Sequence, residues 1–544
     1  MPTMTNILTV RDLHIQARHK HGTTEIVKGI DLDLKPGEVL GLVGESGAGK
    51  STLGLAAMGY TRDGCRISSG SIRFRDQELV GASASTLRHL HGNSIAYVAQ
   101  SAAASFNPSH RLIDQFTEAP LEHGVRSRKQ AEADAIQLYR EMQLPNPEEI
   151  GFRYPYQVSG GQLQRAMTAM AMSCKPDLII FDEPTTALDV TTQIEVLAAI
   201  RKVVKEHNTA AIYITHDLAV VSQMADRIMV LRDGHMVETA PTEEMLANPK
   251  EDYTKSLWAV RTLHRETRPR PEKTPLLAID KVTAHYGEFK ALDSISFDIL
   301  PQRTVAVVGE SGSGKSTLAK VITGLLPHSP GGEIRWQGEA LPPRLQDRDK
   351  TILRDVQMIY QMPDTALNPR HRVRDVVGRP LTFYLGLHGA EKEERLRSLM
   401  EQIELDPDIY LNRRITELSG GQKQRIGIAR ALAAEPRFII CDEVTSALDQ
   451  LVAEGILKLL LKLQEKYGLT YMFITHDLAT VEAIADDVVV MQHGKIVEQG
   501  TRDEVFSPPH PDYSARLLAS VPEMDPHWLD RVLAEQKIDL LENN

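Results

Sequence analysis

The string GESGAGKS at residues 44–51 decides the fold, and it returns almost unchanged as GESGSGKS at residues 309–316. Both copies match G-x-x-x-x-G-K-[S/T], a glycine-rich loop whose backbone N–H groups cradle phosphate oxygens at a helix N-terminus. Their lysines, Lys50 and Lys315, are 265 positions apart, and the same further motifs follow each loop in the same order. The chain is therefore predicted to be a tandem duplication of a domain that binds nucleoside triphosphates.

The composition favours a cytosolic protein without membrane spans. The formal net charge of −11 disfavours a nucleic acid or an anionic membrane surface as the main partner. The cysteines, Cys65, Cys174 and Cys441, form no C-x-x-C pair, so we expect neither a disulfide framework nor a zinc site. No secretory signal is expected, and no apolar run reaches the roughly 18 residues that a bilayer span needs. If the protein serves transport, other chains must supply the pore.

The repeat also suggests domain boundaries. We expect a first domain at residues 1–262, a linker at 263–275, a second domain at 276–522 and a tail at 523–544. The linker prediction comes from the basic, proline-containing string RTLHRETRPRPEKTP (261–275). A flexible linker of this length would reach about 20 Å.

Short apolar runs in each half predict buried parallel strands. The runs in the first half are EVLGLV (38–43), LIIF (178–181) and AIYIT (211–215), and those in the second are RTVAVV (303–308), FIIC (438–441) and YMFIT (471–475). The stretches between them read as helices: Ser127 and Gln130 have capping-box spacing. Apolar stripes follow at helical spacing and predict core packing: Ala135, Leu138, Tyr139 and Met142, then Leu396, Leu399, Met400 and Ile403. The expected fold class is α/β, a sheet with helices on both faces.

The two phosphate loops assign the first set of binding residues. Lys50 and Lys315 should reach the β- and γ-phosphates, and the hydroxyls of Ser51 and Ser316 should hold Mg²⁺. The threonines that follow, Thr52 and Thr317, should lie near the α-phosphate. The complete predicted loops are Gly44, Glu45, Ser46, Gly47, Ala48, Gly49, Lys50, Ser51, Thr52, and Gly309, Glu310, Ser311, Gly312, Ser313, Gly314, Lys315, Ser316, Thr317.

Two carboxylates stand at the end of one apolar strand in each half, in LIIFDE and FIICDE. The first of each pair, Asp182 or Asp442, is suited to hold Mg²⁺ through water. The second, Glu183 or Glu443, is suited to orient or deprotonate an attacking water.

The strings VSGGQLQR (158–165) and LSGGQKQR (418–425) resemble the signature motif of ATP-binding-cassette (ABC) ATPases. The resemblance covers nearly the whole chain, twice. It implies tandem P-loop domains, each with a RecA-like α/β core, an antiparallel β subdomain and a helical subdomain, that bind ATP and Mg²⁺ and hydrolyse ATP. It also implies two composite sites, in which the signature of one unit contacts nucleotide on the other: Lys50 with Ser419, Gly420, Gly421 and Gln422, and Lys315 with Ser159, Gly160, Gly161 and Gln162.

The remaining motifs of that family match by register. Gln100 and Gln361 resemble the Q-loop glutamine, which contacts Mg²⁺ and water and couples to membrane subunits. The D-loop aspartates would be Asp189 and Asp449, and the switch histidines near the γ-phosphate would be His216 and His476, both in ITHD.

Two positions depart from the family pattern. The aromatic residue that stacks on adenine fits Tyr286 in the second half, whereas ungapped alignment puts His21 there in the first. The strand end continues as Asp-Glu-Pro at 182–184 but as Asp-Glu-Val at 442–444. Because both glutamates are present, we expect both sites to hydrolyse ATP, with unequal affinity.

Further strings resemble the oligopeptide, dipeptide and nickel importer branch of the family. They are FNP (106–108), LNP (367–369), YPYQ (154–157), EDYTKSL (251–257) and HPDYSARLL (510–518). Some members carry a C-terminal cysteine cluster, but no cysteine follows Cys441. The resemblance implies an ATPase subunit of a bacterial importer for peptides or related solutes, held at the cytoplasmic face of the inner membrane by two permease subunits that work with a solute-binding protein.

The alternative is a tandem ABC ATPase outside transport. A translation factor of the ABC-F type would carry a long charged helical linker, whereas the linker here is about 15 residues long. A subunit supporting phosphonate degradation stays open. Co-purification from native membranes would discriminate, by capturing either membrane proteins with a solute-binding protein or ribosomes.

Overall fold

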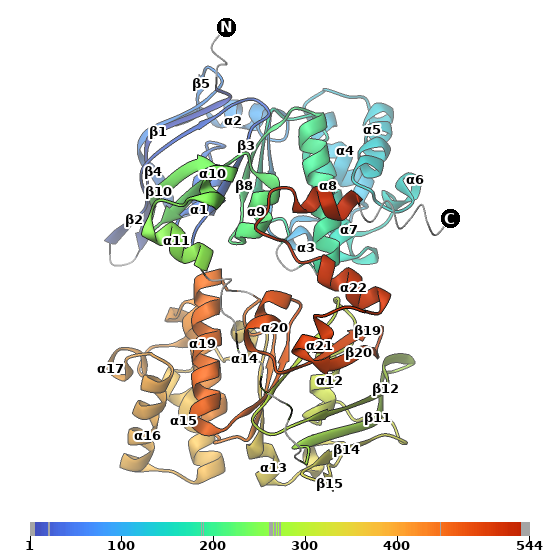
Figure 1. Cartoon of the computed structure of the whole chain (residues 1–544). Helices are drawn as coiled ribbons and strands as arrows, with labels where there is room; N and C mark the ends of the chain where they lie inside the picture. Colours follow the sequence, from blue (N-terminus) through green and yellow to red (C-terminus); the bar gives the residue numbers. More distant parts are fainter. Residues whose placement is uncertain are drawn as a thin grey trace. The chain divides into compact units, whose positions relative to one another are not determined.

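The computed structural model describes residues 6–19, 22–185, 188, 190–259, 265, 268, 270, 274–446 and 448–534 (Figure 1). The chain divides into two compact units. The first contains Met1–Ala259 together with Pro522–Asn544, and the second contains Val260–Val521. The segments that the sequence predicts as linker and tail are thus each grouped with one of the compact units.

The first unit has two sheets. A six-stranded sheet has the order β10-β9-β3-β8-β7-β6, in which neighbours from β9 to β6 are parallel and β10 is antiparallel. A four-stranded antiparallel sheet has the order β2-β1-β4-β5. The strands are β1 (Leu8–His19), β2 (Gly22–Leu34), β3 (Val39–Val43), β4 (Cys65–Phe74), β5 (Gln77–Glu78), β6 (Ile95–Val98), β7 (Leu178–Asp182), β8 (Ala210–Ile214), β9 (Arg227–Arg232) and β10 (His235–Pro241).

The predicted strands of the first half are confirmed. Every residue of β7 and β8 is buried, which is why these strands read as continuous apolar runs rather than as alternating ones. The helices are α1 (Lys50–Ala56), α2 (Ala84–Leu90), α3 (Ala102–Ser105), α4 (Leu112–Glu122), α5 (Arg128–Glu141), α6 (Pro147–Ile150), α7 (Gly160–Ala171), α8 (Val190–Glu206), α9 (Leu218–Met224), α10 (Thr242–Ala247) and α11 (Asp252–Ala259). The capping box of Ser127 and Gln130 opens α5 as predicted, and Ala135, Leu138 and Tyr139 are buried on it.

The second unit repeats the architecture. Its sheets have the orders β16-β17-β18-β13-β19-β20 and β12-β11-β14-β15. The strands are β11 (Leu277–Tyr286), β12 (Phe289–Ile299), β13 (Thr304–Val308), β14 (Glu333–Trp336), β15 (Glu339–Ala340), β16 (Val356–Ile359), β17 (Phe438–Asp442), β18 (Thr470–Ile474), β19 (Asp487–Gln492) and β20 (Lys495–Thr501). The helices are α12 (Lys315–Ile322), α13 (Lys350–Asp355), α14 (Pro363–Ala366), α15 (Val373–Leu385), α16 (Gly389–Gln402), α17 (Pro407–Tyr410), α18 (Gly420–Leu432), α19 (Gln450–Tyr467), α20 (Leu478–Ile484), α21 (Arg502–Val505) and α22 (Asp512–Ala519).

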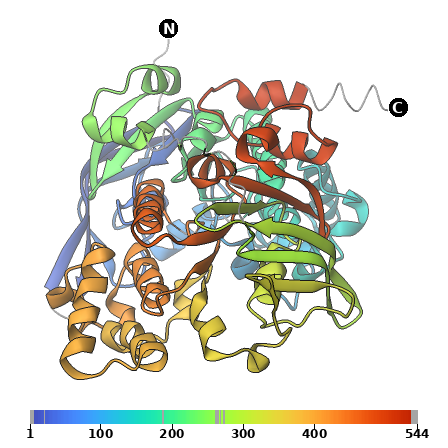
Figure 2. The same cartoon turned by 60° about the horizontal axis from the view of Figure 1, so that its bottom comes forward.

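Within each unit, the antiparallel sheet and the helical subdomain lie on opposite sides of the parallel sheet (Figures 1 and 2). The stripe of Leu396, Leu399, Met400 and Ile403 is buried in one hydrophobic cluster with strands β17 and β18. The fold class is therefore as predicted: two α/β P-loop domains in tandem. Among the described residues, no helix combines the length and the apolar character that crossing a bilayer requires.

Candidate functional site

The phosphate loop of the first unit connects buried strand β3 to helix α1. Gly44 has φ 147°, and a Cβ there would lie 2.1 Å from the Leu231 carbonyl oxygen, so only glycine fits. The helix begins at Lys50, whose buried Nζ donates to the carbonyl oxygens of Gly44 at 2.6 Å and Glu45 at 2.9 Å. In the second unit, Lys315 bonds in the same way to the carbonyls of Gly309 and Glu310, both at 2.7 Å. In both units the predicted loop thus wraps around the ammonium of its lysine, which bonds to two carbonyl oxygens of the loop.

The hydroxyl that follows each lysine contacts the predicted strand-end aspartate. Ser51 Oγ donates to Asp182 Oδ1 at 2.8 Å, and Ser316 Oγ donates to Asp442 Oδ1 at 3.1 Å. Burial raises the pKa of Asp442, partly offset by the Ser316 bond. Mg²⁺ prefers oxygen ligands such as hydroxyl and carboxylate oxygens, so each serine–aspartate pair fits the predicted metal.

The glutamate after each aspartate is held in an unusual backbone conformation. Glu183 has φ 50° and Glu443 has φ 48°, a region that costs a non-glycine residue about 1–3 kcal/mol. The N–H of Glu183 donates to the Ile214 carbonyl and that of Glu443 to the Ile474 carbonyl, both at 2.9 Å. The neighbouring strand therefore fixes this geometry in both units.

Each glutamate side chain contacts the predicted glutamine and histidine. Gln100 Nε2 donates to Glu183 Oε2 at 2.9 Å, and His216 Nδ1 lies 3.3 Å from Glu183 Oε1. In the second unit, Gln361 bonds to Glu443, and His476 Nδ1 lies 3.4 Å from Glu443 Oε1. Three residues far apart in sequence thus meet at the carboxyl edge of the parallel sheet.

The pKa values in these clusters follow from burial and from the glutamate–histidine contact. Burial lowers the pKa of His476, but its hydrogen bond to Glu443 and the negative charges of Glu443 and Asp477 together outweigh burial, so the net pKa is raised. For Glu443 the signs are reversed: burial raises its pKa, but the contact with His476, together with the charge of Lys315 and a hydrogen bond from Ser446, lowers the net pKa below the usual range. The pKa of His216 is raised for the same reasons as that of His476.

The signature strings open two helices of the helical subdomains. Ser159 caps α7 and Ser419 caps α18, each accepting from the backbone N–H of the glutamine three residues later. Gly161 must be glycine, because a Cβ there would lie 2.1 Å from Thr192 Cγ2. Asp449 caps α19 by accepting from the Val452 N–H at 3.0 Å, whereas Asp189 lies outside the described residues.

The predicted adenine-stacking position can be located in one unit only. Tyr286 ends strand β11 and is 45% exposed, with Lys320 Nζ 5.8 Å from the ring centre. Its face is therefore accessible to an aromatic base. His21, the predicted counterpart, lies outside the described residues.

The structure adds tyrosines that sequence reasoning had not assigned to the sites. Tyr253 OH accepts from the Glu45 N–H at 3.3 Å, and Tyr513 OH accepts from the Glu310 N–H at 2.9 Å. These tyrosines belong to EDYTKSL and HPDYSARLL, so their presence after both units was the available signal. A third tyrosine, Tyr97, donates to Asp182 Oδ2 at 2.7 Å. The equivalent position in the second unit is Met358, so this tyrosine is not part of a repeated motif.

The model of the ABC transporter family matches this chain twice, at residues 27–186 and 292–446. A second model, the C-terminal region of oligopeptide/dipeptide transporters, matches residues 497–544. The chain belongs to the ABC transporter family and is one of its ATP-binding, ATP-hydrolysing proteins.

Among curated proteins, the chain is similar to the glutathione import ATP-binding protein GsiA of Escherichia coli O157:H7. The two are 37% identical over 564 aligned residues, which cover 96% of this chain and 90% of that protein. The protein of the same name from E. coli strain K12 is 36% identical with the same coverage. A solved structure of the archaeal ribosome recycling factor aABCE1, in complex with the ribosomal stalk protein aP1, superposes with a TM-score of 0.61 at 20% identity, covering 91% of this chain and 90% of that one. That last likeness shows the fold alone.

Proposed function

We propose that this protein energises a bacterial importer for peptides or related small solutes, such as glutathione, by hydrolysing ATP in both of its units. The observation that carries the proposal is the glutamate–histidine–glutamine cluster, which recurs in both units with near-identical contacts. The import direction rests on the similarity to the GsiA proteins and on the C-terminal region match.

The roles of the site residues follow from their chemistry. Lys50 and Lys315 stabilise phosphate charge, since each buried ammonium is held inside the loop by the backbone carbonyl oxygens to which it donates. Bound Mg²⁺, held by Ser51 with Asp182 and Ser316 with Asp442, would neutralise charge on the β- and γ-phosphates. Asp442 could be held in its charged form by such a cation, which opposes the effect of burial.

Glu183 and Glu443 position the attacking water and accept its proton. The charge on Glu443 is favoured by His476, so that carboxylate is ionised and able to accept a proton at neutral pH. His216 and His476 orient their glutamates. Gln100 and Gln361 bond to the same glutamates, and so link the segment that follows each glutamine to the site of hydrolysis.

The signature helices complete the nucleotide sites in this proposal. Ser159–Gln162 would serve the nucleotide of Lys315, and Ser419–Gln422 that of Lys50. The capped N-termini of α7 and α18 support this role, because the first glycine of each helix, Gly160 or Gly420, is exposed and its backbone is open to an anion.

A groove in the second unit suits a membrane partner. It has a volume of about 900 Å³ and lies on the segment that follows Gln361. Its lining includes Asn368 of the LNP string, Phe383 of α15, which is 56% exposed, and Arg430 of α18. A short helix of a permease loop would place an apolar side chain against Phe383 and carbonyl or carboxylate oxygens against Arg430.

The test is capture from native membranes after gentle solubilisation. We expect two integral membrane proteins and, through them, a solute-binding protein. Phe383→Asp should weaken this capture, whereas Tyr467→Asp, which changes an exposed aromatic residue on α19 of the same unit, should not. Capture of ribosomes, or unimpaired solute uptake after deletion of the gene, would contradict the import function.

A further inference from the structure

The C-terminal tail is built into the first unit, although it follows the second unit in sequence. Residues 528–534 are helical, and Trp528, Leu529 and Val532 are buried in the same hydrophobic cluster as Phe181 of β7 and Met224 of α9. In Figure 1 this red C-terminal segment lies next to α8, and Asp530 pairs with Arg201 of that helix. The core of the first unit therefore includes residues from the C-terminal end of the chain.

One buried amide fastens this tail. Gln223, the penultimate residue of α9, donates through Nε2 to the carbonyl oxygens of Glu523 at 3.0 Å and Asp525 at 2.7 Å. Its Oε1 accepts from the Leu529 N–H at 3.0 Å. Gln223 thus holds the tail backbone at three points, and the tail in turn holds the C-terminal end of α9.

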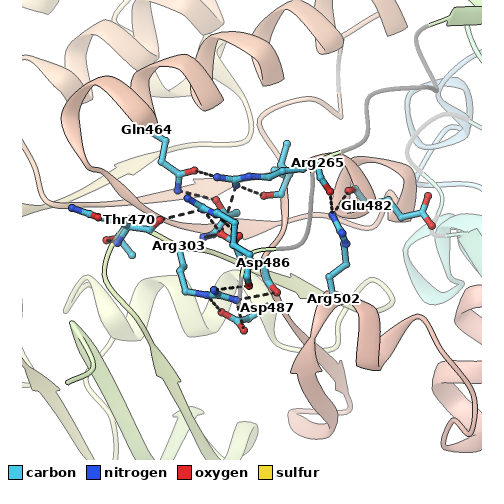
Figure 3. Close-up of polar contacts among 12 residues, drawn as sticks. Arg265, Arg303, Gln464, Thr470, Glu482, Asp486, Asp487 and Arg502 are labelled. Atoms are coloured by element: carbon cyan, nitrogen blue, oxygen red, sulfur yellow. Dashed lines mark hydrogen bonds and ion pairs between the residues drawn. The ribbon is translucent and has the colours of Figure 1, made fainter. Parts of the chain in front are cut away.

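In the second unit, Arg265 of the linker occupies the corresponding place. Figure 3 shows Arg265 between Gln464 of α19 and the C-terminal end of α20. Its guanidinium donates to the Ile484 carbonyl at 2.9 Å and to Gln464 Oε1 at 2.8 Å. Arg502 donates to the carbonyls of Glu482, at 3.1 Å, and of Arg265, at 2.7 Å. A cation at the last carbonyls of a helix is favourable, because these acceptors carry the negative end of the helix dipole.

The helices held in this way are those that follow the switch histidines. Helix α9 begins two residues after His216 and α20 begins two residues after His476. Each has seven residues, too short to be stable without tertiary contacts. Asp217 and Asp477 cap the N-terminal ends, so the histidine backbone continues directly into the helix.

We propose that Gln223 and Arg265 are positioning residues for ATP hydrolysis, which act through the short helices α9 and α20 on His216 and His476. The tail would set the first histidine and the linker the second, so that each histidine depends on a segment outside the repeated domain. The contacts of His216 and His476 with their glutamates, at 3.3 and 3.4 Å, are near the limit of a hydrogen bond, so a small displacement of either helix would break them. This inference rests on the roles proposed above for the two histidines.

The experiment compares two variants of the full chain, each the matched control of the other. Gln223→Leu keeps the side-chain volume but removes the bonds to the tail, and Arg265→Met keeps most of the chain length but removes the guanidinium. Hydrogen exchange, read by mass spectrometry, should rise about fivefold or more in 218–224 for the first variant and in 478–484 for the second, each leaving the other helix unchanged. The kcat for ATP is measured for each variant in a chain whose other site is disabled by Glu443→Gln or Glu183→Gln; it should fall about threefold to tenfold, with KM changed less than about twofold, because the phosphate loops are untouched.

A tail variant tests the same link from the other side. Trp528→Ala should reproduce the exchange pattern and the kcat loss of Gln223→Leu, and Trp528→Phe should restore both. Unchanged exchange in α9 for Gln223→Leu and Trp528→Ala would overturn the proposal. So would faster exchange throughout the first unit with a normal kcat, which would make the tail a stabilising element only. If His216→Ala keeps full activity, the role assigned to the histidine fails, while the exchange result still reports whether the tail holds α9.

Discussion

The two units place the same predicted catalytic side chains on the same elements at the carboxyl edge of the parallel sheet, but ion pairs of reversed charge support the amino edge. In the second unit, Arg303 makes a bidentate pair with Asp487, at 2.7 and 3.1 Å. In the first, the acidic partner precedes the strand instead: Arg227 donates to Glu38 at 3.0 Å. The strand registers show that Glu38 of the first unit is equivalent in position to Arg303 of the second, and Arg227 to Asp487. The acidic and basic residues of the pair have therefore changed places.

A neighbouring carboxylate differs in its surroundings. Asp226 and Asp486 each accept from the first N–H of the central strand at 2.8 Å. Asp486 is also bound by Arg268 of the linker and is buried, whereas Asp226 is exposed and borders a cavity of about 480 Å³ together with Gln223 and Pro526. Burial opposes the charge of Asp486, but the bonds from Arg268 and the Thr304 N–H lower its pKa.

The contacts that both units share are those that the fold requires. Both units have a carboxylate that accepts from the first N–H of the central strand, and one ion pair beside it, so the fold requires both contacts. The order of the acidic and basic residues in the ion pair differs between the units. The segment packed beside this edge also differs: it includes a linker arginine in the second unit and the tail in the first. The carboxyl edge, which holds the predicted catalytic residues, shows less variation, as expected if both sites bind the same nucleotide.

The largest effect is expected from the glutamates, and it tests whether the two sites are equal. The double variant Glu183→Gln with Glu443→Gln should lower ATP turnover by about 100-fold or more, because water positioning and proton acceptance are both lost. ATP should still bind, since Lys50 and Lys315 are unchanged. Phosphate release and nucleotide binding are measured for the double variant and for each single variant. Near-normal release by the double variant would reject the assigned roles, and unequal single variants would show that the sites differ.

Next in size is the cost of breaking the ion pair at the opposite edge. Arg303→Met leaves Asp487 buried without its bidentate partner and should destabilise the second unit by about 3–5 kcal/mol. Arg227→Met should cost the first unit about 1 kcal/mol, since its pair is more exposed. Calorimetric unfolding of the full chain measures both. Exchanging the charges, with Arg303→Glu and Asp487→Arg together, should recover part of the loss; equal losses for the two single variants would contradict the comparison.

Adenine binding should separate the units by a smaller factor. Tyr286→Ala removes an exposed aromatic face and should weaken ATP binding in the second unit about fivefold, the low end of what base stacking contributes. His21→Ala should have less effect on the first unit, because imidazole is a smaller ring. ATP is titrated for each variant in a chain whose other phosphate-loop lysine is disabled. Equal small losses for both variants would reject the asymmetry.

The smallest effect concerns pH. The pKa of His476 is raised in the folded protein by Glu443, so the pair stabilises fully below about pH 6.5, and its contribution is lost as pH rises through the raised pKa. The lowered pKa of Glu443 adds stability that is present above about pH 4.5 and is lost as pH falls through the lowered value. His476→Gln should therefore lower Tm near about pH 6, by an amount worth less than about 1 kcal/mol, and hardly change it near about pH 9. A larger decrease at the higher pH would contradict this sign.

Much of the nucleotide site could be predicted from the sequence, because its chemistry is encoded locally. The phosphate loops need glycine at positions such as Gly44, and the strand-end pair Asp182–Glu183 directly follows an apolar run, so short strings identify both. Tyr253 and Tyr513 were visible as repeated residues, but their hydroxyl contacts to the loop backbone were not, because nothing in the spacing says which atom a tyrosine reaches. The contact of Tyr97 could not be predicted, since the second unit has no tyrosine at the equivalent position.

Two P-loop domains, the residues of each phosphate loop and the family resemblance could all be read from the amino-acid sequence. These are properties of contiguous strings and of their repetition. The places of the tail and of Arg265 and Arg268 of the linker follow from the folded chain alone. Their partners are backbone carbonyls and buried side chains about 200 to 300 positions away, such as Gln223 for residues 523–529. A carbonyl oxygen is the same in every residue, so a contact made to it leaves no mark in the sequence, and only the folded chain shows it.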